Sequence, residues 1–305
     1  MRILILGAGG IGGYYGARLI EAGHEVTFLV RPARAERLRE NGLRVIRHAD
    51  EFAGPGPVAT AARPDLHPDL VMLSCKAYDL DSALAAIAPA VGANTRILPL
   101  LNGLRHLEAL DAVFGAEHVL GGLCQISVTL DDTGVIRQFS PLDRLTFGTR
   151  NPASPVPPAL SAGLRGLGTN VVERVDILQA MWEKFVFITA LAGITSLLRG
   201  SIGEIAATPE GAQLAQRLYG ECMQTAAYCG HAPAEAAHAD AVQKLTTPTS
   251  TLKASMLRDL ERGGRTECEH ILGDMRARAY AHAIETPLLS VALAHLRVYE
   301  ASRAQ

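Results

Sequence analysis

The hydrophobic positions in the first half of the chain come in short aliphatic runs, and segments with a helical pattern separate several of these runs. The helical patterns begin near Ile11 and Ala83. Aliphatic runs that alternate with helices are typical of parallel strands in a sheet that is covered on both faces. We therefore expect strands at Arg2–Leu6, Glu25–Val30, Leu43–Ile46, Leu70–Cys75, Arg96–Leu100 and His118–Gln125.

The pattern changes before the last third of the chain. Val135–Phe139 and Leu145–Gly148 are a further strand group and predict an edge hairpin, and Val171–Val175 predicts a last strand. From Asp176 on, the pattern is helical almost to the end. Because 305 residues exceed a typical single domain, we predict an α/β domain at residues 1–175 and an all-α domain at residues 176–305.

The charge of the chain narrows the choice of partners. The formal net charge is −2, and acidic and basic residues are scattered along the sequence. Proteins that bind nucleic acids or membrane surfaces carry a concentrated basic face. We therefore expect neither a nucleic acid nor a membrane as partner.

The cysteines, the position of the first predicted strand and the longest apolar stretch indicate the cellular compartment of the protein. Five cysteines show no CxxC spacing, so we expect no disulfide framework and no metal site, which fits a reducing compartment. The first predicted strand begins at residue 2 and leaves no room for a signal peptide. The longest apolar stretch, Phe185–Leu198, is too short to span a bilayer. We expect a cytoplasmic protein.

A glycine-rich turn follows the first predicted strand. Gly7, Gly9 and Gly12 satisfy G-x-G-x-x-G, and the turn opens a predicted helix, which is the context that a dinucleotide site requires. The free N–H groups and the positive dipole at a helix start favour a pyrophosphate, whereas a turn without a ligand is the alternative. The context favours a Rossmann-type cofactor domain. Its predicted contact residues in the turn are Gly7, Ala8, Gly9, Gly10, Ile11 and Gly12.

The end of the second predicted strand indicates which cofactor binds. NAD sites place an acidic residue there, about 20 residues past the glycines, to hold the ribose 2′-hydroxyl. This chain has Arg31 instead, with Arg34 nearby. A guanidinium binds a 2′-phosphate bidentately, so we favour NADP (NADPH) over a purely solvated arginine.

Two further strand ends carry polar residues. Lys76 follows Leu70–Cys75, and Asn102-Gly103 follows Arg96–Leu100. The carboxyl edge of a parallel sheet is where such folds bind ligands. Taken alone, a lysine at a strand end is commonplace, and Asn-Gly is first of all a turn signal.

The first helix of the predicted all-α domain contains one cation. Lys184 shares a face with Met181, Ile188 and Leu191, and apolar residues occupy the other faces of the helix. Burial would lower the pKa of this lysine and make it a usable proton donor near neutrality. The alternative is a lysine that extends its ammonium group to solvent.

A polar segment from Ser255 to Glu267 follows later in the same domain. Thr266 and Glu269 predict a capping box, with Glu267 at the first helical position. Glu267 therefore has a purely structural interpretation as a helix-dipole acid, and Ser255 has one as a helix-surface serine.

As a set, these residues resemble the ketopantoate reductase (2-dehydropantoate 2-reductase) family, and the resemblance covers essentially the whole chain. The pieces that match are the glycine turn, Arg31, Lys76 within Cys-Lys-Ala, Asn102-Gly103, Lys184 within Trp-Glu-Lys, and the segment from Ser255-Met-Leu to Thr266-Glu267.

The resemblance implies a role for each residue. The glycine turn, Arg31 and Lys76 would hold NADPH, and Asn102 would contact the nicotinamide side and help to seat the substrate. Lys184 would be the general acid, and Ser255 would bind the substrate carboxylate. Glu267 would organise the catalytic site and contact the cofactor. The implied reaction is the reduction of ketopantoate to pantoate in pantothenate biosynthesis.

The chain departs from the family at four positions. Its ketopantoate reductases have asparagines where this chain has Ile188, Ala192, Ile202 and Leu252. Loss of amides that pair with a polar substrate changes specificity strongly. One alternative is therefore a relative that acts on a more apolar 2-keto or 2-hydroxy acid.

A second alternative is an NADP-sensing binding protein without turnover, against which the retention of Lys184, Ser255 and Glu267 counts. The expected partner is a small-molecule 2-keto acid. Alanine-rich segments such as Ala234–Ala241 fit either a homodimer contact or core packing.

Overall fold

The computed structural model describes residues 1–168 and 170–303, and the chain forms two compact units. The first, here called the α/β unit, comprises Met1–Leu101 and His106–Leu178. The second, the helical unit, comprises Asn102–Arg105 and the described residues from Gln179 onward. Asn102, which we expected in the first domain, therefore belongs to the helical unit.

A parallel five-stranded sheet forms the centre of the α/β unit, with the strand order β5-β2-β1-β6-β7. Its central strands are buried on both faces, since the residues of β6 are all fully buried. The structure thus confirms the expected α/β fold, and it confirms four of the six aliphatic runs as strands of this sheet. The bounds are β1 (Arg2–Leu6), β2 (Glu25–Leu29), β5 (Val58–Ala59), β6 (Leu70–Leu73) and β7 (Arg96–Pro99).

A second sheet of the same unit has the order β10-β9-β3-β4, with β8 paired to β9. The run Leu43–Ile46 is a strand, but it belongs here and pairs with β4 in an antiparallel manner. The last expected run, His118–Gln125, is represented by β8. The bounds are β3 (Leu43–Ile46), β4 (Glu51–Gly54), β8 (Gly121–Leu130), β9 (Ile136–Gly148) and β10 (Asn170–Glu173).

The expected edge hairpin is wrong, because Val135–Phe139 and Leu145–Gly148 belong largely to the single strand β9. The intervening Ser140–Arg144 has the composition of a turn, with serine, proline and aspartate. Within this segment, Asp143 and Arg144 pair with Ile126 and Gln125 of β8, whereas Ser140–Leu142 lie at a register shift between the two strands. The strand thus continues through this segment, and the local turn signal coincides with an irregularity in its pairing.

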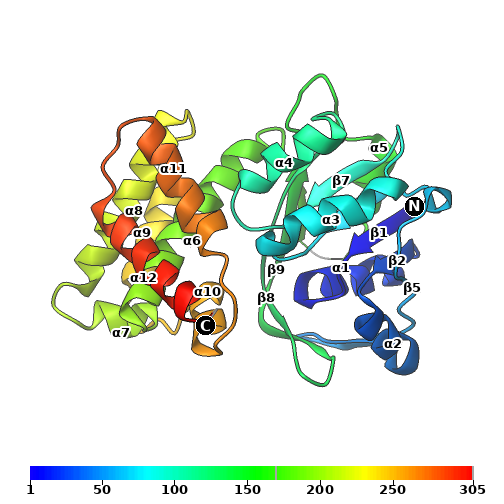
Figure 1. Ribbon diagram of the computed structural model, residues 1–305, viewed down its shortest axis with the longest axis horizontal. Helices are drawn as coiled ribbons and strands as arrows, with labels where there is room; N and C mark the ends of the chain where they lie inside the picture. Colours follow the sequence, from blue (N-terminus) through cyan, green and yellow to red (C-terminus); the bar gives the residue numbers. More distant parts are fainter. Residues whose placement is uncertain (169, 304–305) are drawn as a thin grey trace. The chain divides into compact units, whose positions relative to one another are not determined.

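Helix α1 packs against strands of both sheets, β1 and β2 on one side and β3, β8 and β9 on the other (Figure 1). Glycines make this close approach possible. A Cβ at Gly16 would lie 2.3 Å from Phe28 of β2, and one at Gly13 would lie 2.1 Å from Ile136 of β9. The helices of this unit are α1 (Gly10–Glu21), α2 (Pro32–Asn41), α3 (Leu80–Ile87), α4 (Arg105–Phe114) and α5 (Pro158–Arg165).

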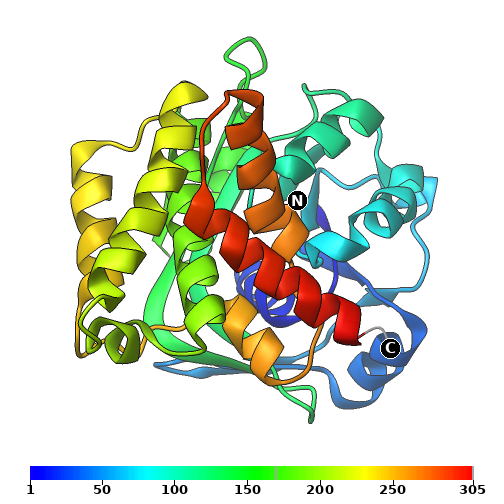
Figure 2. The same ribbon diagram turned by 60° about the vertical axis from the view of Figure 1, so that its left-hand side comes forward.

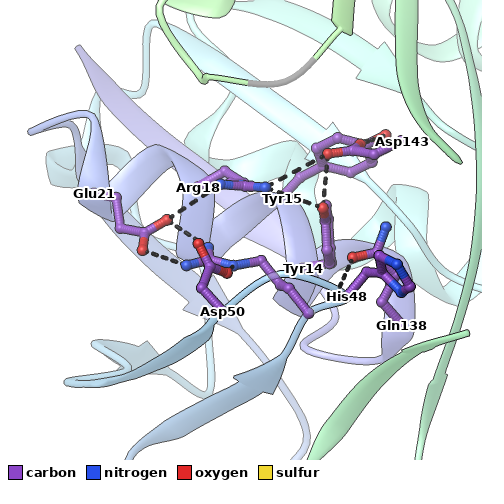
Figure 3. Close-up of polar contacts among 9 residues, drawn as sticks. Tyr14, Tyr15, Arg18, Glu21, His48, Asp50, Gln138 and Asp143 are labelled. Carbon is purple, nitrogen blue, oxygen red and sulfur yellow. Dashed lines mark hydrogen bonds and ion pairs between the residues drawn. The ribbon is translucent and has the colours of Figure 1, made fainter. Parts of the chain in front are cut away.

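A polar network also ties α1 to the second sheet (Figure 3). The hydroxyls of Tyr14 and Tyr15 donate to the two carboxylate oxygens of Asp143 on β9, at 2.6 and 3.3 Å. Arg18 lies 3.8 Å from the same carboxylate. Burial, followed by the hydrogen bond to Asp143, raises the pKa of Tyr14 to about 12. The network therefore favours the neutral phenols of Tyr14 and Tyr15.

The helical unit contains no strand among its described residues, as expected for an all-α domain. Its C-terminal helix α12 packs on α8 and on the short π-helix η4 (Figure 2). The helices are α6 (Ile177–Leu198), α7 (Ile202–Ala206), α8 (Gly211–Tyr228), α9 (Glu235–Thr246), α10 (Ser255–Glu261), η4 (Glu269–Gly273), α11 (Asp274–Ala281) and α12 (Pro287–Arg303).

Helix α6 (Ile177–Leu198) is longer than the apolar stretch Phe185–Leu198 that it contains. Its 22 residues make it, among the described residues, the one helix long and apolar enough to cross a membrane by length and composition. Within its most apolar window, 67% of the residues are buried inside the protein, as in the core helix of a globular unit.

Candidate active site

The glycine turn begins where β1 ends, and its shape depends on glycine at two positions. Gly7 has φ +94°, a conformation that side chains disfavour. A Cβ at Gly12 would lie 2.2 Å from both the Gly7 carbonyl oxygen and the Ser74 Oγ. The chain therefore turns tightly enough for α1 to start directly against the end of the sheet.

The first turn of α1 presents backbone N–H groups. Its N-cap is Gly9, no side chain of the described residues caps it, and no acidic residue lies in this turn. A Cβ at Gly9 would have no atom of the described chain within 4 Å. A helix start of this kind attracts an anion and lets it approach the backbone closely, so these residues fit the pyrophosphate of a dinucleotide.

The two arginines after β2 occupy different places. Arg31 is the N-cap of α2; its side chain is 80% exposed, and its Nη2 lies 3.2 Å from Oδ2 of Asp79. Arg34 is half-buried, and its Nε and Nη2 donate to the carbonyl oxygen of Ala8 at 3.2 and 3.0 Å. Arg34 thus fixes the glycine turn, while the guanidinium of Arg31 remains accessible to solvent.

The carboxyl end of β6 also contacts the turn. The Ser74 hydroxyl donates to the carbonyl oxygen of Leu6 at 3.1 Å, which links the ends of the neighbouring strands β1 and β6. Lys76 follows two residues later as the half-buried N-cap of a 3₁₀ turn, Ala77–Asp79. Lys76 therefore lies near the sheet edge that carries the glycine turn.

The turn Asn102-Gly103 follows β7 and is held within the helical unit. A ring N–H of His270 donates to the backbone of Asn102. Gly103 has φ +80°, and a Cβ on it would lie 3.1 Å from both the Cδ2 and the carbonyl oxygen of His270. The turn therefore fits closely over this histidine.

Glu267 is 8% exposed and lies just before η4. Its carbonyl oxygen accepts from the backbone N–H groups of His270 and Ile271, both at 3.1 Å. His270 thus bonds to Asn102 through its ring and to Glu267 through its backbone, and it brings these two predicted site residues together.

The predicted capping box at Thr266 and Glu269 is wrong. The N–H and hydroxyl of Thr266 both donate to the carboxylate of Glu300 on α12, at 2.6 and 2.7 Å. Glu269 instead accepts from Arg297, also on α12, at 2.6 and 2.9 Å. Charged partners from a distant helix have replaced the local pairing, and Glu267 precedes the helix rather than opening it.

Lys184 and Ser255 come from two helices of the helical unit. Lys184 is half-buried on α6 between the buried Met181 and Phe185, and it is the only lysine, arginine or histidine of that helix. Ser255 is the exposed first residue of α10.

The four apolar substitutions lie in the same unit. Ile202 and Ala192 are buried at 0% and 3% exposure, and Ile188 and Leu252 are half-buried. The N–H of Ile202 donates to the carbonyl of Leu252 at 2.9 Å. Two of the replaced positions, Ile202 and Leu252, are therefore direct neighbours, and Leu252 lies three residues before Ser255 in the sequence.

Two contact residues, Ser74 and His270, could not be identified from the sequence, and neither could the contact of Arg34 with the glycine turn. Their partners, Leu6, Asn102 and Ala8, are far away in the sequence. The signals available were weak, namely a second arginine after Arg31 and a histidine one helical turn after Glu267.

Comparisons with known proteins agree with this architecture. The family model "Ketopantoate reductase PanE/ApbA" matches residues 3–152, and its C-terminal counterpart matches residues 176–300. The uncharacterized oxidoreductase YkpB of Bacillus subtilis (strain 168) is 37% identical over 304 residues, which cover 99% of this chain and 100% of that protein.

Solved structures are similar over the full length. The 2-dehydropantoate 2-reductase from Geobacter metallireducens GS-15 is 28% identical with a TM-score of 0.87, and the match covers 97% of this chain and 99% of that one. A D-mandelate dehydrogenase in a ternary structure with NADH and anilino(oxo)acetate has a TM-score of 0.90 at 21% identity, with 100% and 99% covered. At that identity the likeness shows the fold alone.

The fold and these matches define an oxidoreductase that acts on keto or hydroxyl groups. The chain belongs to the ketopantoate reductase family, as its motifs indicated. This family uses NAD(P)H.

Proposed function

We propose that the protein catalyses the NADPH-dependent reduction of a 2-keto acid to a 2-hydroxy acid. The observation that carries the proposal is Lys184, the single cation of α6, half-buried among apolar residues. We propose a cytoplasmic enzyme with a cofactor domain at residues 1–175, a catalytic domain at 176–305, no metal, and a homodimeric assembly. Its partner is a small-molecule keto acid rather than a nucleic acid or a membrane.

The α/β unit supports a dinucleotide with a 2′-phosphate. The start of α1 and the open space at Gly9 suit the pyrophosphate, and Lys76 adds a positive charge near the same edge. Among the described residues, Arg31 pairs with the carboxylate of Asp79 in an exposed bridge. Exposed ion pairs contribute about 0–1 kcal/mol, so a doubly charged phosphate can displace Asp79.

Residues of the helical unit supply the remaining chemistry, and NADPH, when bound, supplies the hydride. The ammonium of Lys184 stabilises negative charge that develops on the keto oxygen and donates a proton to it. Ser255 binds the substrate carboxylate. Asn102 orients the nicotinamide side and the substrate, and the buried carboxyl of Glu267 organises the site and contacts the cofactor.

The first substrate candidate is ketopantoate, reduced to pantoate in pantothenate biosynthesis. Family membership and the likeness to the Geobacter metallireducens reductase support it. The second candidate is a more apolar 2-keto or 2-hydroxy acid. Ile188, Ala192, Ile202 and Leu252 favour it, because they replace hydrogen-bonding amides with hydrocarbon.

A panel assay of the wild-type protein separates the two candidates. The loss of NADPH absorbance is followed with ketopantoate and with aliphatic and aromatic 2-keto acids. In the reverse direction, the gain of NADPH absorbance is followed with NADP⁺ and the matching hydroxy acids. A kcat/KM for ketopantoate well above all others supports the first candidate. A higher kcat/KM for an aliphatic or aromatic acid supports the second, and no turnover on any compound refutes the proposed reaction.

The general-acid role is tested with Lys184→Ala. The variant should lower kcat by about 10²–10⁴-fold, the typical contribution of general acid catalysis, with little change in the Kd for NADPH. Lys244→Ala, which removes an exposed lysine paired with Asp240 on α9, is the control. Turnover of the Lys184 variant at the wild-type rate would disprove the assignment.

The cofactor preference is tested with Arg31→Ala. Loss of a charge-assisted contact of about 1.5–3 kcal/mol predicts a weakening of NADPH binding by about one to two orders of magnitude, with the Kd for NADH nearly unchanged. Arg63→Ala, which breaks a similar exposed bridge to Asp65, is the matched control. Equal weakening of both cofactors would rule out contact with the 2′-phosphate.

A further inference from the structure

One histidine outside the predicted catalytic set bonds to two segments of the helical unit. The first is the turn Asn102–Arg105, which belongs to this unit although the chain on either side of it belongs to the other. The second is the segment that ends in Glu267. His270, on the short π-helix η4, lies at both.

The contact with the first segment is made by the side chain. The ring of His270 donates to the backbone of Asn102 and lies against Gly103, where a Cβ would approach Cδ2 to 3.1 Å. The left-handed φ of Gly103 closes the turn over the ring. His270 is 9% exposed, so its polar edge needs a protein partner, and the turn supplies one.

The contact with the second segment is made by the backbone. The N–H groups of His270 and Ile271 share the carbonyl oxygen of Glu267. A π-turn widens the helix locally, and such turns occur frequently at functional sites. Any displacement of the ring is therefore coupled to the backbone that carries Glu267.

The charge state of the ring suits this arrangement. Burial is the largest influence on the pKa of His270 and lowers it. The carboxylates of Glu267 and Asp274 raise this pKa, and the charge of Arg105 lowers it further. A neutral imidazole has one N–H to donate. That single donor is used on the backbone of Asn102.

We propose that His270 is a positioning residue that fixes the side chain of Asn102 relative to Glu267. Its contact with Asn102 is made through the backbone, and it takes no part in proton or hydride transfer. This inference rests on the proposed function, in which Asn102 orients the nicotinamide side and the substrate.

The first test measures the turn directly. Amide hydrogen exchange of a peptide spanning residues 102–105 is compared in wild type, His270→Phe and His270→Gln. The phenylalanine keeps a ring and loses the donor, whereas the glutamine keeps an N–H donor. Exchange should rise at least about tenfold in the first variant, as expected when one hydrogen bond is lost, and should return toward wild type in the second.

A matched control removes a histidine–backbone bond elsewhere. The ring of His118 in the α/β unit bonds to the carbonyl of Thr95 at 2.8 Å. His118→Phe should leave the exchange of residues 102–105 unchanged. If His270→Phe does not fold, His270→Met gives the same comparison. Unchanged exchange in the His270 variant that folds overturns the proposal.

The second test is a double-mutant cycle with Asn102→Ala, which removes the amide and keeps the backbone carbonyl. His270→Phe should lower kcat/KM about tenfold in the wild-type background and less than about twofold in the Asn102→Ala background, because no positioned side chain remains to be disturbed. Additive effects would show a merely structural role and overturn the proposal.

The two tests separate this inference from the proposed function. Should the wild-type protein turn over none of the 2-keto acids, the proposed function fails, and the Kd for NADPH replaces kcat/KM in the same cycle. If Asn102→Ala matches wild type in both quantities, Asn102 has no functional side chain and the positioning role is overturned.

Discussion

Two glycines of the same turn have opposite surroundings, and this difference decides what each contributes. The space beside Gly12 is filled by the Gly7 carbonyl and Ser74, whereas the space beside Gly9 is open in the described chain. Gly12 is therefore required by the fold itself. Gly9 is required only when a ligand occupies the open space.

Alanine at each position should separate these two requirements. Gly12→Ala places a methyl 2.2 Å from backbone and should lower the free energy of unfolding by about 1–3 kcal/mol, the usual cost of overpacking. Gly9→Ala should lower it by less than about 1 kcal/mol and still weaken NADPH binding. Urea unfolding and NADPH titration of both variants provide the measurements.

If Gly9→Ala binds NADPH as tightly as wild type, the pyrophosphate does not approach this backbone. If Gly12→Ala unfolds like wild type, the turn relaxes more easily than its packing suggests.

At the scale of elements, helix α12 holds the segment that carries Glu267. Tyr299 donates to the carbonyl of Gly264 at 2.8 Å, Glu300 accepts twice from Thr266, and Arg297 pairs with Glu269. Burial raises the pKa of Glu300, but the hydrogen bonds from Thr266 and the contacts with Arg303 together outweigh burial and leave that pKa below its usual value. A helix at the end of the chain thus shapes a segment more than thirty residues earlier.

Glu300→Ala should lower the free energy of unfolding by about 1–3 kcal/mol, because it leaves the buried N–H and hydroxyl of Thr266 without their acceptor. Glu300→Gln keeps an acceptor oxygen and should recover most of this loss. Chemical denaturation of both variants gives the comparison. Equal losses in the two variants would mean that charge, rather than the acceptor, holds the segment.

At the scale of the whole molecule, the buried tyrosines of α1 make the folding stability of the protein fall at alkaline pH. The pKa of Tyr14 in the folded protein is about 12, above its ordinary value of 10.0, because of burial and the hydrogen bond to Asp143. A raised pKa means that folding favours the neutral phenol. Its stabilisation is therefore complete below pH 10.0 and is lost as the pH rises through about 12.

Tyr14→Phe tests this dependence. At neutral pH it should lower the free energy of unfolding by about 1.5–3 kcal/mol, the contribution of a hydrogen bond to a charged group. The difference between wild type and variant should shrink between pH 10 and 12. Tyr228→Phe, at an exposed position, is the control. A difference that stays constant across this range would contradict the role of the phenol.

The sequence predicted those elements whose signal is local. The strands β1, β2, β6 and β7 were predictable because each is a continuous aliphatic run. The short strands β4 (Glu51–Gly54) and β5 (Val58–Ala59) have no such run and were missed. Ser140–Arg144 resembles a turn; it lies inside β9, and the pairing with β8 shifts register within this stretch.

The same distinction applies to the candidate site. The glycine turn was recognisable from spacing, and Lys184 from its apolar helix. The contacts of Arg34 with Ala8 and of His270 with Asn102 depend on how distant elements pack, and no local pattern records them. The predicted capping box is wrong for the same reason, because Thr266 bonds to the distant Glu300 instead of the nearby Glu269.

The membership of Asn102–Arg105 in the helical unit bears on how this chain can be recombined with its relatives. A chimera joined once, at the 178/179 boundary, would pair these four residues from one parent with His270 from another. A chimera that keeps the loop and His270 from the same parent must take Asn102–Arg105 together with the helical unit. These four residues are then inserted into the α/β unit of the other parent.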